Sequence, residues 1–124
     1  MTKTPMTILV VDDDEMVLAS VGDILQLQGY NVHTASNGRQ GLEQFEAVKP
    51  DLIISDIIMP EMEGIEFVRE LSRLNPDIPL IVMSGDPLGR EFLRAARLLG
   101  AVDTLLKPFT GEQLLEKVRK FTQT

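Results

Sequence analysis

Hydrophobic positions along the chain follow two alternating periods. Five short segments rich in aliphatic and β-branched residues have the length of β-strands, and each is followed by apolar residues that recur every three or four positions, as in an amphipathic helix. The pattern therefore predicts five strand-helix units. Their strands are 7–11, 30–35, 51–55, 79–83 and 102–106, and their helices contain 17–25 and 42–48 and span 65–74, 89–99 and 111–121.

Strands 7–11, 51–55 and 79–83 are continuous apolar runs. Such strands are typically covered on both faces. Strands that alternate with helices pair in parallel through right-handed crossovers. The pattern predicts an α/β fold with a doubly wound parallel sheet, in one domain over residues 1–124 with a core from about residue 7 to about residue 121.

The composition is that of an ordinary globular domain and excludes several partners. Of 124 residues, 44% are hydrophobic and 25% are charged. A net charge of −7 argues against direct binding to nucleic acid or to an anionic membrane. The absence of cysteine excludes disulfides and thiolate metal sites, and no apolar run approaches the ~20 residues of a membrane span. We expect a cytoplasmic protein.

Polar residues stand where four of the predicted strands end. Asp12 and Asp13 follow the first strand, Asp56 the third, Ser84 the fourth and Lys107 the fifth. The carboxyl ends of parallel strands meet at one edge of a sheet, where open α/β folds bind their ligands. We therefore expect these five side chains to share one site.

This combination of side chains indicates metal-assisted chemistry at phosphorus. Neighbouring carboxylates raise one another's pKa, so the site needs positive charge. Lys107 supplies one charge, and Mg²⁺, which prefers oxygen ligands, suits a pair formed by Asp13 and Asp56. A carboxylate beside a divalent cation, a lysine and a hydroxyl can attack a phosphoryl group. Asp56 is the candidate nucleophile and would form an aspartyl-phosphate.

Four motifs together resemble the response-regulator receiver domain of two-component signalling. They are VVDDDE at 10–15, DLIISDIIMPEMEG at 51–64, VMSGD at 82–86 and LKPF at 106–109. Each motif alone is weak, but the four occur in register with the five strand-helix units and cover nearly the whole chain. The resemblance implies the flavodoxin-like (βα)5 fold of the chemotaxis regulators, with strand order 2-1-3-4-5.

The resemblance also implies a role for each acidic residue. Asp56 corresponds to the phosphoacceptor. Asp13 and Asp56 correspond to direct Mg²⁺ ligands, Asp12 binds the metal mainly through water, and the backbone carbonyl of Ile58 completes the protein ligands. These four residues are the predicted metal site.

Two further residues have roles implied by the resemblance. Ser84 corresponds to the hydroxyl that hydrogen-bonds the phosphoryl group on activation, and Lys107 to its ion-pair partner. The peptide bond between Lys107 and Pro108 is expected to be cis, which an X-Pro bond tolerates at low cost.

Two features depart from the pattern that the resemblance implies. The family usually carries tyrosine or phenylalanine at position 104, where its rotamer reports phosphorylation, but this chain has Thr104. Ile58, two residues beyond Asp56, and Asp86 correspond to positions that flank the path of the water attacking the phosphoryl group. We expect the bulky Ile58 to obstruct this water and to prolong the phosphorylated state.

The implied partners are proteins. A sensor histidine kinase or a histidine phosphotransfer protein would supply the phosphoryl group. The receiver would then change its partner-binding surface toward a downstream protein target or an output domain outside this chain. Dimerisation through the fourth and fifth units is left open. Such a switch modifies only itself and is not a metabolic enzyme.

Three other functions are compatible with the same topology or with some of the same residues. A pseudo-receiver binds partners without phosphorylation, and Thr104 keeps this alternative open. An aspartate-nucleophile phosphatase typically has the motif Asp-x-Asp, whereas Asp56 is followed by Ile57 and Ile58. A flavin-binding module would need a phosphate loop rich in Ser, Thr and Gly, but residues 12–15 are all acidic.

Simple structural roles are the remaining interpretation. An aspartate before a helix caps its first turn, and we assign that role to Asp14. One cap cannot explain both Asp12 and Asp13. Ser84 could merely start a turn, and Lys107 could be a solvated lysine, but neither interpretation explains why these residues stand at matching strand ends.

Overall fold

The computed structural model describes residues 5–56, 64–74, 77–85, 94, 97 and 100–122. Five parallel strands form one sheet in the order β2-β1-β3-β4-β5, which confirms the predicted flavodoxin-like topology. The strands are β1 (Thr7–Val11), β2 (Asn31–Ala35), β3 (Leu52–Asp56), β4 (Leu80–Ser84) and β5 (Asp103–Leu106).

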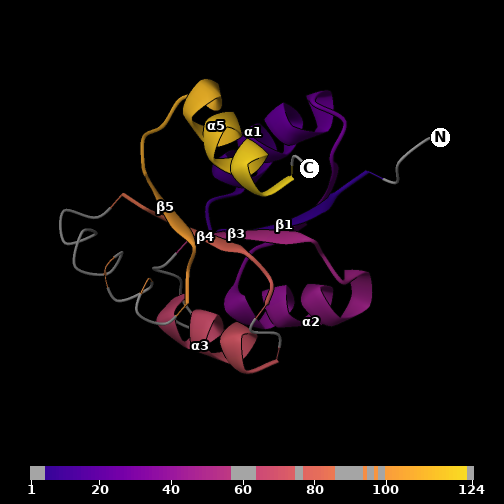
Figure 1. Ribbon diagram of the computed structural model, residues 1–124, viewed down its shortest axis with the longest axis vertical. Coiled ribbons are helices and arrows are strands. Elements are labelled where there is room, and N and C mark those ends of the chain that lie inside the picture. The colour runs from indigo at the N-terminus through magenta and orange to yellow at the C-terminus, as the bar shows by residue number, and fades with distance from the viewer. Residues whose placement is uncertain are drawn as a thin grey trace.

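Helices cover both faces of this sheet (Figure 1). Helices α1 (Glu15–Leu27) and α5 (Gly111–Thr122) lie on one face, and α2 (Gly38–Val48) and α3 (Gly64–Leu74) lie on the other. The predicted helix 89–99 lies mostly outside the described residues. None of the helices in the described part of the chain has the length and apolar character needed to span a membrane.

The core consists of two apolar layers, one on each side of the sheet. Successive strand residues alternate between the layers, so Ile53 packs on the side of α3 and Ile54 on the side of α1 and α5. Strands β3 and β4 are buried along their whole length, as their continuous apolar runs predict. Each fully buried aliphatic side chain contributes about 1.5–3 kcal/mol, so burial of these strands is a large part of what stabilises the sheet.

Asparagine and aspartate caps fix where the first two helices begin. The Asp14 side chain accepts a hydrogen bond from the backbone N–H of Met16 at 2.9 Å, which confirms its predicted capping role. Asn37 accepts one from Gln40 in the same way at 2.8 Å. Such caps typically contribute about 1 kcal/mol each.

Strands β3 and β4 end one residue later than the apolar pattern predicts. Asp56 and Ser84 are the last residues of their strands, in register with Met83 and Leu106, instead of the first residues after them. Pairing with neighbouring strands continues past the apolar run, and hydrophobicity does not mark where pairing stops. The sheet therefore fixes the backbone of both residues directly.

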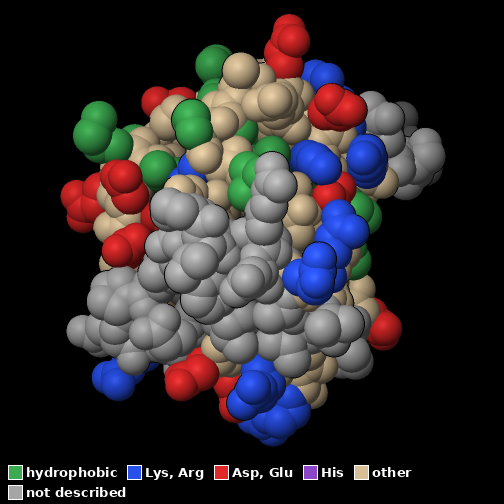
Figure 2. All heavy atoms as spheres, turned by 90° about the vertical axis from the view of Figure 1, so that its left-hand side faces the viewer, with side chains coloured by type: hydrophobic (Ala, Val, Ile, Leu, Met, Phe, Trp, Pro, Cys, Tyr) green, Lys and Arg blue, Asp and Glu red, His purple; other side chains and the backbone are tan. Residues whose placement is uncertain are grey.

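A buried carboxylate connects β5 to α5. Asp103 is 7% exposed, and its carboxylate lies 2.9 Å from Lys117 Nζ, 3.6 Å from Arg97 Nη2 and 3.8 Å from Lys120 Nζ. Figure 2 views the molecule from the left-hand side of Figure 1 and shows several Lys and Arg side chains gathered on that face. Burial would raise the pKa of Asp103, but the hydrogen bonds from Lys117 and the Thr104 backbone and the nearby positive charges outweigh it and lower the pKa.

We expect Asp103→Asn to lower the free energy of unfolding by about 1–3 kcal/mol at pH 7, because partly buried cations lose their counter-charge. Since the folded-state pKa is lowered, this stabilisation is present above the unfolded value of about 3.9 and is lost as the pH falls through the folded value. Urea denaturation at pH 7 and pH 3 measures both effects.

The matched control for this prediction is Glu70→Gln. Glu70 pairs with Arg73 at 2.8 Å on the surface of α3, where Arg73 is well exposed and Glu70 is partly exposed. Such a pair contributes at most about 0.5 kcal/mol. Equal losses in the two variants would contradict a special role for Asp103.

Candidate functional site

Hydrogen bonds with three other residues hold Asp12 at the end of β1. It is fully buried, and its backbone N–H donates to the carbonyl of Ala35 in β2 at 3.1 Å. Its Oδ1 accepts from the backbone N–H of Asp14 at 2.9 Å, and its Oδ2 accepts from Lys107 Nζ at 2.7 Å. The turn between β1 and α1 therefore fixes the Asp12 carboxylate in one orientation.

Three carboxylates gather at this edge of the sheet. One oxygen from each of Asp12, Asp13 and Asp56 lies within 4.8 Å of the other two. Asp12 and Asp56 are buried, whereas Asp13 is exposed. Carboxylate oxygens are the ligands that hard divalent cations prefer, and the open side at Asp13 suits Mg²⁺, which retains several waters. This donor set fits Mg²⁺; the predicted fourth ligand, Ile58, lies outside the described residues.

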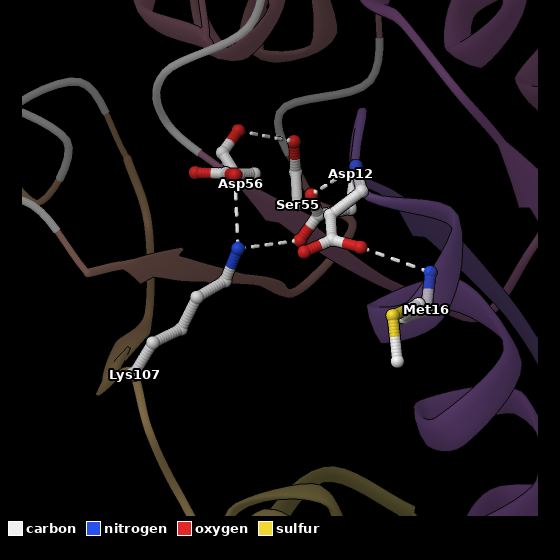
Figure 3. A network of polar contacts seen from close by, with 6 residues as sticks. Asp12, Met16, Ser55, Asp56 and Lys107 are labelled. Atoms are coloured by element: carbon white, nitrogen blue, oxygen red, sulfur yellow. Dashed lines mark hydrogen bonds and ion pairs between the residues drawn. The ribbon is translucent and has the colours of Figure 1, made fainter.

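Lys107 bridges two of these carboxylates (Figure 3). Its Nζ lies 2.7 Å from Asp12 Oδ2 and 3.0 Å from Asp56 Oδ2. The residue follows β5 directly, and its peptide bond to Pro108 is cis, as predicted. Lys107 is therefore not a freely solvated lysine, and its charge lies within the acidic cluster.

Gly85 allows the lysine to reach this position, and the sequence alone did not reveal its role. A Cβ atom at Gly85 would lie 3.1 Å from Lys107 Cβ, closer than side chains normally pack, and in ordinary contact with Lys107 Cδ at 3.6 Å. The motif SGDP indicates a turn, which accounts for a glycine without any contact to Lys107. Its position directly after a predicted site residue was the only available signal.

Ser84 lies at the same edge of the sheet, at the end of β4. It is 1% exposed, and its carbonyl accepts a hydrogen bond from the backbone N–H of Lys107 at 2.9 Å. In the sheet register, Ser84 is opposite Leu106, and its neighbour Met83 is opposite Asp56. The structure thus brings all predicted side chains of the site to one edge, with β4 between Asp56 and Lys107.

The charges at this edge are unbalanced. Burial raises the pKa of Asp12 to about 6, assisted by the charge of Asp56, although hydrogen bonds from Lys107 and the Asp14 backbone oppose the shift. Burial would lower the pKa of Lys107, but its hydrogen bonds and ion pairs with the two carboxylates outweigh this effect and raise it. The lysine stays protonated at neutral pH, and the cluster attracts further positive charge.

Thr104 lies away from this cluster, in the middle of β5. It is partly buried and opposite Val82 in the register. It lines a groove of about 840 Å³ together with Arg94, Arg97 and Leu106, among others. Where the resemblance implies an aromatic ring, this chain therefore has a small side chain beside an open groove.

Comparison with known families identifies one that matches almost the whole chain. The response regulator receiver domain matches residues 8–119. This span includes every residue of the predicted site.

Individual proteins and structures give the same result. Response regulator MprA from Mycolicibacterium vanbaalenii is 39% identical over 116 residues, which cover 93% of this chain and 49% of that protein. Chemotaxis protein CheY from Thermotoga maritima is 33% identical over 117 residues, which cover 94% of this chain and 97% of that protein. The chain thus spans about half the length of MprA and nearly all of CheY.

A solved structure supports the fold as well. The crystal structure of a CheY-like response regulator receiver domain protein from Methanospirillum hungatei has a TM-score of 0.89 and 32% identity to this chain. The similarity covers 94% of this chain and 93% of that one. The observed strand order and the sequence comparisons therefore agree.

We expect Asp12→Asn to stabilise the metal-free protein at pH 7.5 by about 1–3 kcal/mol. The native Asp12 pKa is raised to about 6, so between the unfolded value of about 3.9 and that value the folded state binds more protons. Stability of the native protein consequently falls as the pH rises through this window, whereas asparagine cannot ionise. Urea denaturation in EDTA at pH 5 and pH 7.5 measures the difference.

Asp23→Asn is the control for this prediction, because Asp23 is exposed on α1. Its substitution should change stability by less than about 0.5 kcal/mol at either pH. A stabilisation by Asp12→Asn that is equally large at pH 5 would contradict the assigned cause.

Proposed function

Because the chain belongs to the response regulator receiver domain family, we propose that it is a signalling switch that accepts a phosphoryl group on Asp56. Receiver domains are signalling modules and not metabolic enzymes. The observation that carries this proposal is the contact of Lys107 Nζ with Asp56 at 3.0 Å beside the three-carboxylate cluster. A simple turn role for Asp56 would not explain why a lysine and two further carboxylates lie beside it.

The proposed reaction transfers a phosphoryl group from a phosphohistidine to Asp56. An Asp56 carboxylate oxygen attacks phosphorus, the new O–P bond forms, and the P–N bond breaks, so that the imidazole leaves with its electron pair and takes a proton from solvent. Lys107 would pair with the phosphoryl oxygens, and the Ser84 hydroxyl would donate a hydrogen bond to one of them.

The metal site of this proposal consists of Asp13 and Asp56 as direct ligands, Asp12 through water and the backbone carbonyl of Ile58. Bound Mg²⁺ would neutralise the phosphoryl oxygens as their charge develops. Lys107, which also pairs with Asp12, holds the Asp56 carboxylate from the protein side. The distances among the three aspartates and the exposure of Asp13 support this assignment.

We propose that the protein acts in the cytoplasm and that its phosphoryl donor is a sensor histidine kinase or a histidine phosphotransfer protein. The output would be a downstream protein or an additional domain, since the chain spans about half the length of MprA. Thr104 implies that the output surface responds without an aromatic rotamer switch. Dimerisation through the fourth and fifth units remains a prediction.

The alternative functions have less support. A pseudo-receiver would have no use for an acid cluster, a bridging lysine and a buried serine at one edge of the sheet. A phosphatase of the aspartate-nucleophile type would need a second acid two residues beyond Asp56, where the chain has Ile58.

Incubation with Mg²⁺ and acetyl phosphate, followed by intact mass measurement, tests the proposed function. We expect the native protein to gain one phosphoryl group and Asp56→Asn to gain none. Asp51→Asn is the matched control, because Asp51 is an exposed carboxylate just before the same strand, where its side chain accepts from the Thr7 backbone at 2.8 Å. No adduct on the native protein would refute the proposal.

We further expect Ile58→Asn to shorten the lifetime of the phosphorylated state. A polar side chain two residues beyond the acceptor would admit and orient the attacking water, which an aliphatic side chain would obstruct. Loss of the adduct over time, after removal of acetyl phosphate, gives the two hydrolysis rates. Equal rates, or faster hydrolysis in the native protein, would show that Ile58 does not protect the phosphoryl group.

A further inference from the structure

Ser55, the residue before Asp56, has no role in the function described so far. It is fully buried in β3, and its hydroxyl donates a hydrogen bond to the backbone carbonyl of Asp56 at 2.9 Å (Figure 3). The three preceding residues of the strand, Leu52, Ile53 and Ile54, are all aliphatic. Ser55 is therefore the one polar residue among those that precede Asp56 in the strand.

The hydroxyl lies within an aliphatic layer. Side chains alternate along β3, so Ser55 faces the same layer as Ile53, and its partners in the register are Val11 and Val82. Burying a hydroxyl among aliphatic side chains is unfavourable unless it is hydrogen-bonded, and even then the net gain over an aliphatic residue is small. An aliphatic side chain at this position would serve the core equally well.

The hydrogen bond acts on the backbone that carries the Asp56 carboxylate. Asp56 is the last residue of β3, where pairing with neighbouring strands ends. Its carboxylate must meet Lys107 at 3.0 Å and stay near Asp12 and Asp13 at the same time. Because the rotamer of a side chain depends on its backbone dihedral angles, holding the Asp56 carbonyl restricts where its carboxylate can point.

We infer that Ser55 is a positioning residue for phosphoryl transfer: its hydroxyl holds the last peptide group of β3 so that the Asp56 carboxylate is aligned for attack on phosphorus. This inference rests on the proposed function of Asp56. It is chemically separate from that function, because Ser55 itself would touch neither the phosphoryl group nor the metal. Small errors in alignment of a nucleophile lower its rate strongly.

The sharpest test compares Ser55→Thr with Ser55→Val. The two new side chains have nearly the same shape, and only threonine keeps the hydroxyl. We expect Ser55→Thr to be labelled by saturating acetyl phosphate and Mg²⁺ at close to the native rate, and Ser55→Val to be slower by about threefold to tenfold, the range expected for one hydrogen bond. The half-saturating acetyl phosphate concentration should be the same in both variants.

Stability separates positioning from a merely structural role. Urea denaturation should show Ser55→Val to be at least as stable as Ser55→Thr, so the slower variant is not the less stable one. Ile53→Val is the control, because it removes one methylene from the same strand and layer, where Ile53 is in register with Leu9 and Leu80 and not with residues of the site. It should be destabilised yet labelled at the native rate. Ser55→Ala, which adds no bulk, should be slow like Ser55→Val.

The outcomes distinguish the inference from the proposed function. Equal labelling rates for Ser55→Thr and Ser55→Val, with the native protein active, would overturn the inference and leave the role of Asp56 intact. The same holds if Ser55→Ala is labelled at the native rate. Failure of the native protein to take up a phosphoryl group would overturn both.

Discussion

The bridge that Lys107 forms between Asp12 and Asp56 is the interaction on which the site depends. In the strand order 2-1-3-4-5, β1 and β3 are neighbours, so their terminal carboxylates lie together, but β4 separates β3 from β5. The lysine must therefore cross the end of β4, where Gly85 leaves space for its stem. Without this charge, two buried carboxylates would face each other uncompensated, which is strongly unfavourable.

The single positive charge of Lys107 does not neutralise three carboxylates, and the remaining negative charge has a consequence for both stability and cation binding. Asp12 has its pKa raised to about 6, so its ionised form at neutral pH costs folding free energy. Proteins tolerate such a cost in folding free energy at sites where function requires it. The same excess of negative charge favours a divalent cation, and the exposed Asp13 leaves one side of the cluster open. Binding of a cation to this cluster would therefore recover the folding free energy lost to the uncompensated charge.

Sequence patterns predicted the sheet and the location of the site, because both depend on local order along the chain. Hydrophobic periodicity gave the five strands, and residues at strand ends gave the acid cluster. Contacts between distant segments could not be read in this way. The fit of Gly85 against Lys107 and the pairing of Asp103 with Lys117 both depend on three-dimensional packing. The hydrogen bond from Ser55 to the carbonyl of Asp56 is local, but hydrophobic periodicity does not reveal side-chain rotamers. The helix at 89–99 and the role of Ile58 remain predictions.

We propose that the fold makes Asp56, and no other carboxylate of the cluster, the nucleophile. Borohydride reduces an acyl phosphate to the alcohol, which marks the modified residue permanently. Reduction of the phosphorylated protein followed by peptide sequencing in a mass spectrometer therefore locates the acceptor. If Asp56 is the acceptor, homoserine is expected at position 56 alone; homoserine at position 12 or 13 instead would rule out Asp56 as the nucleophile.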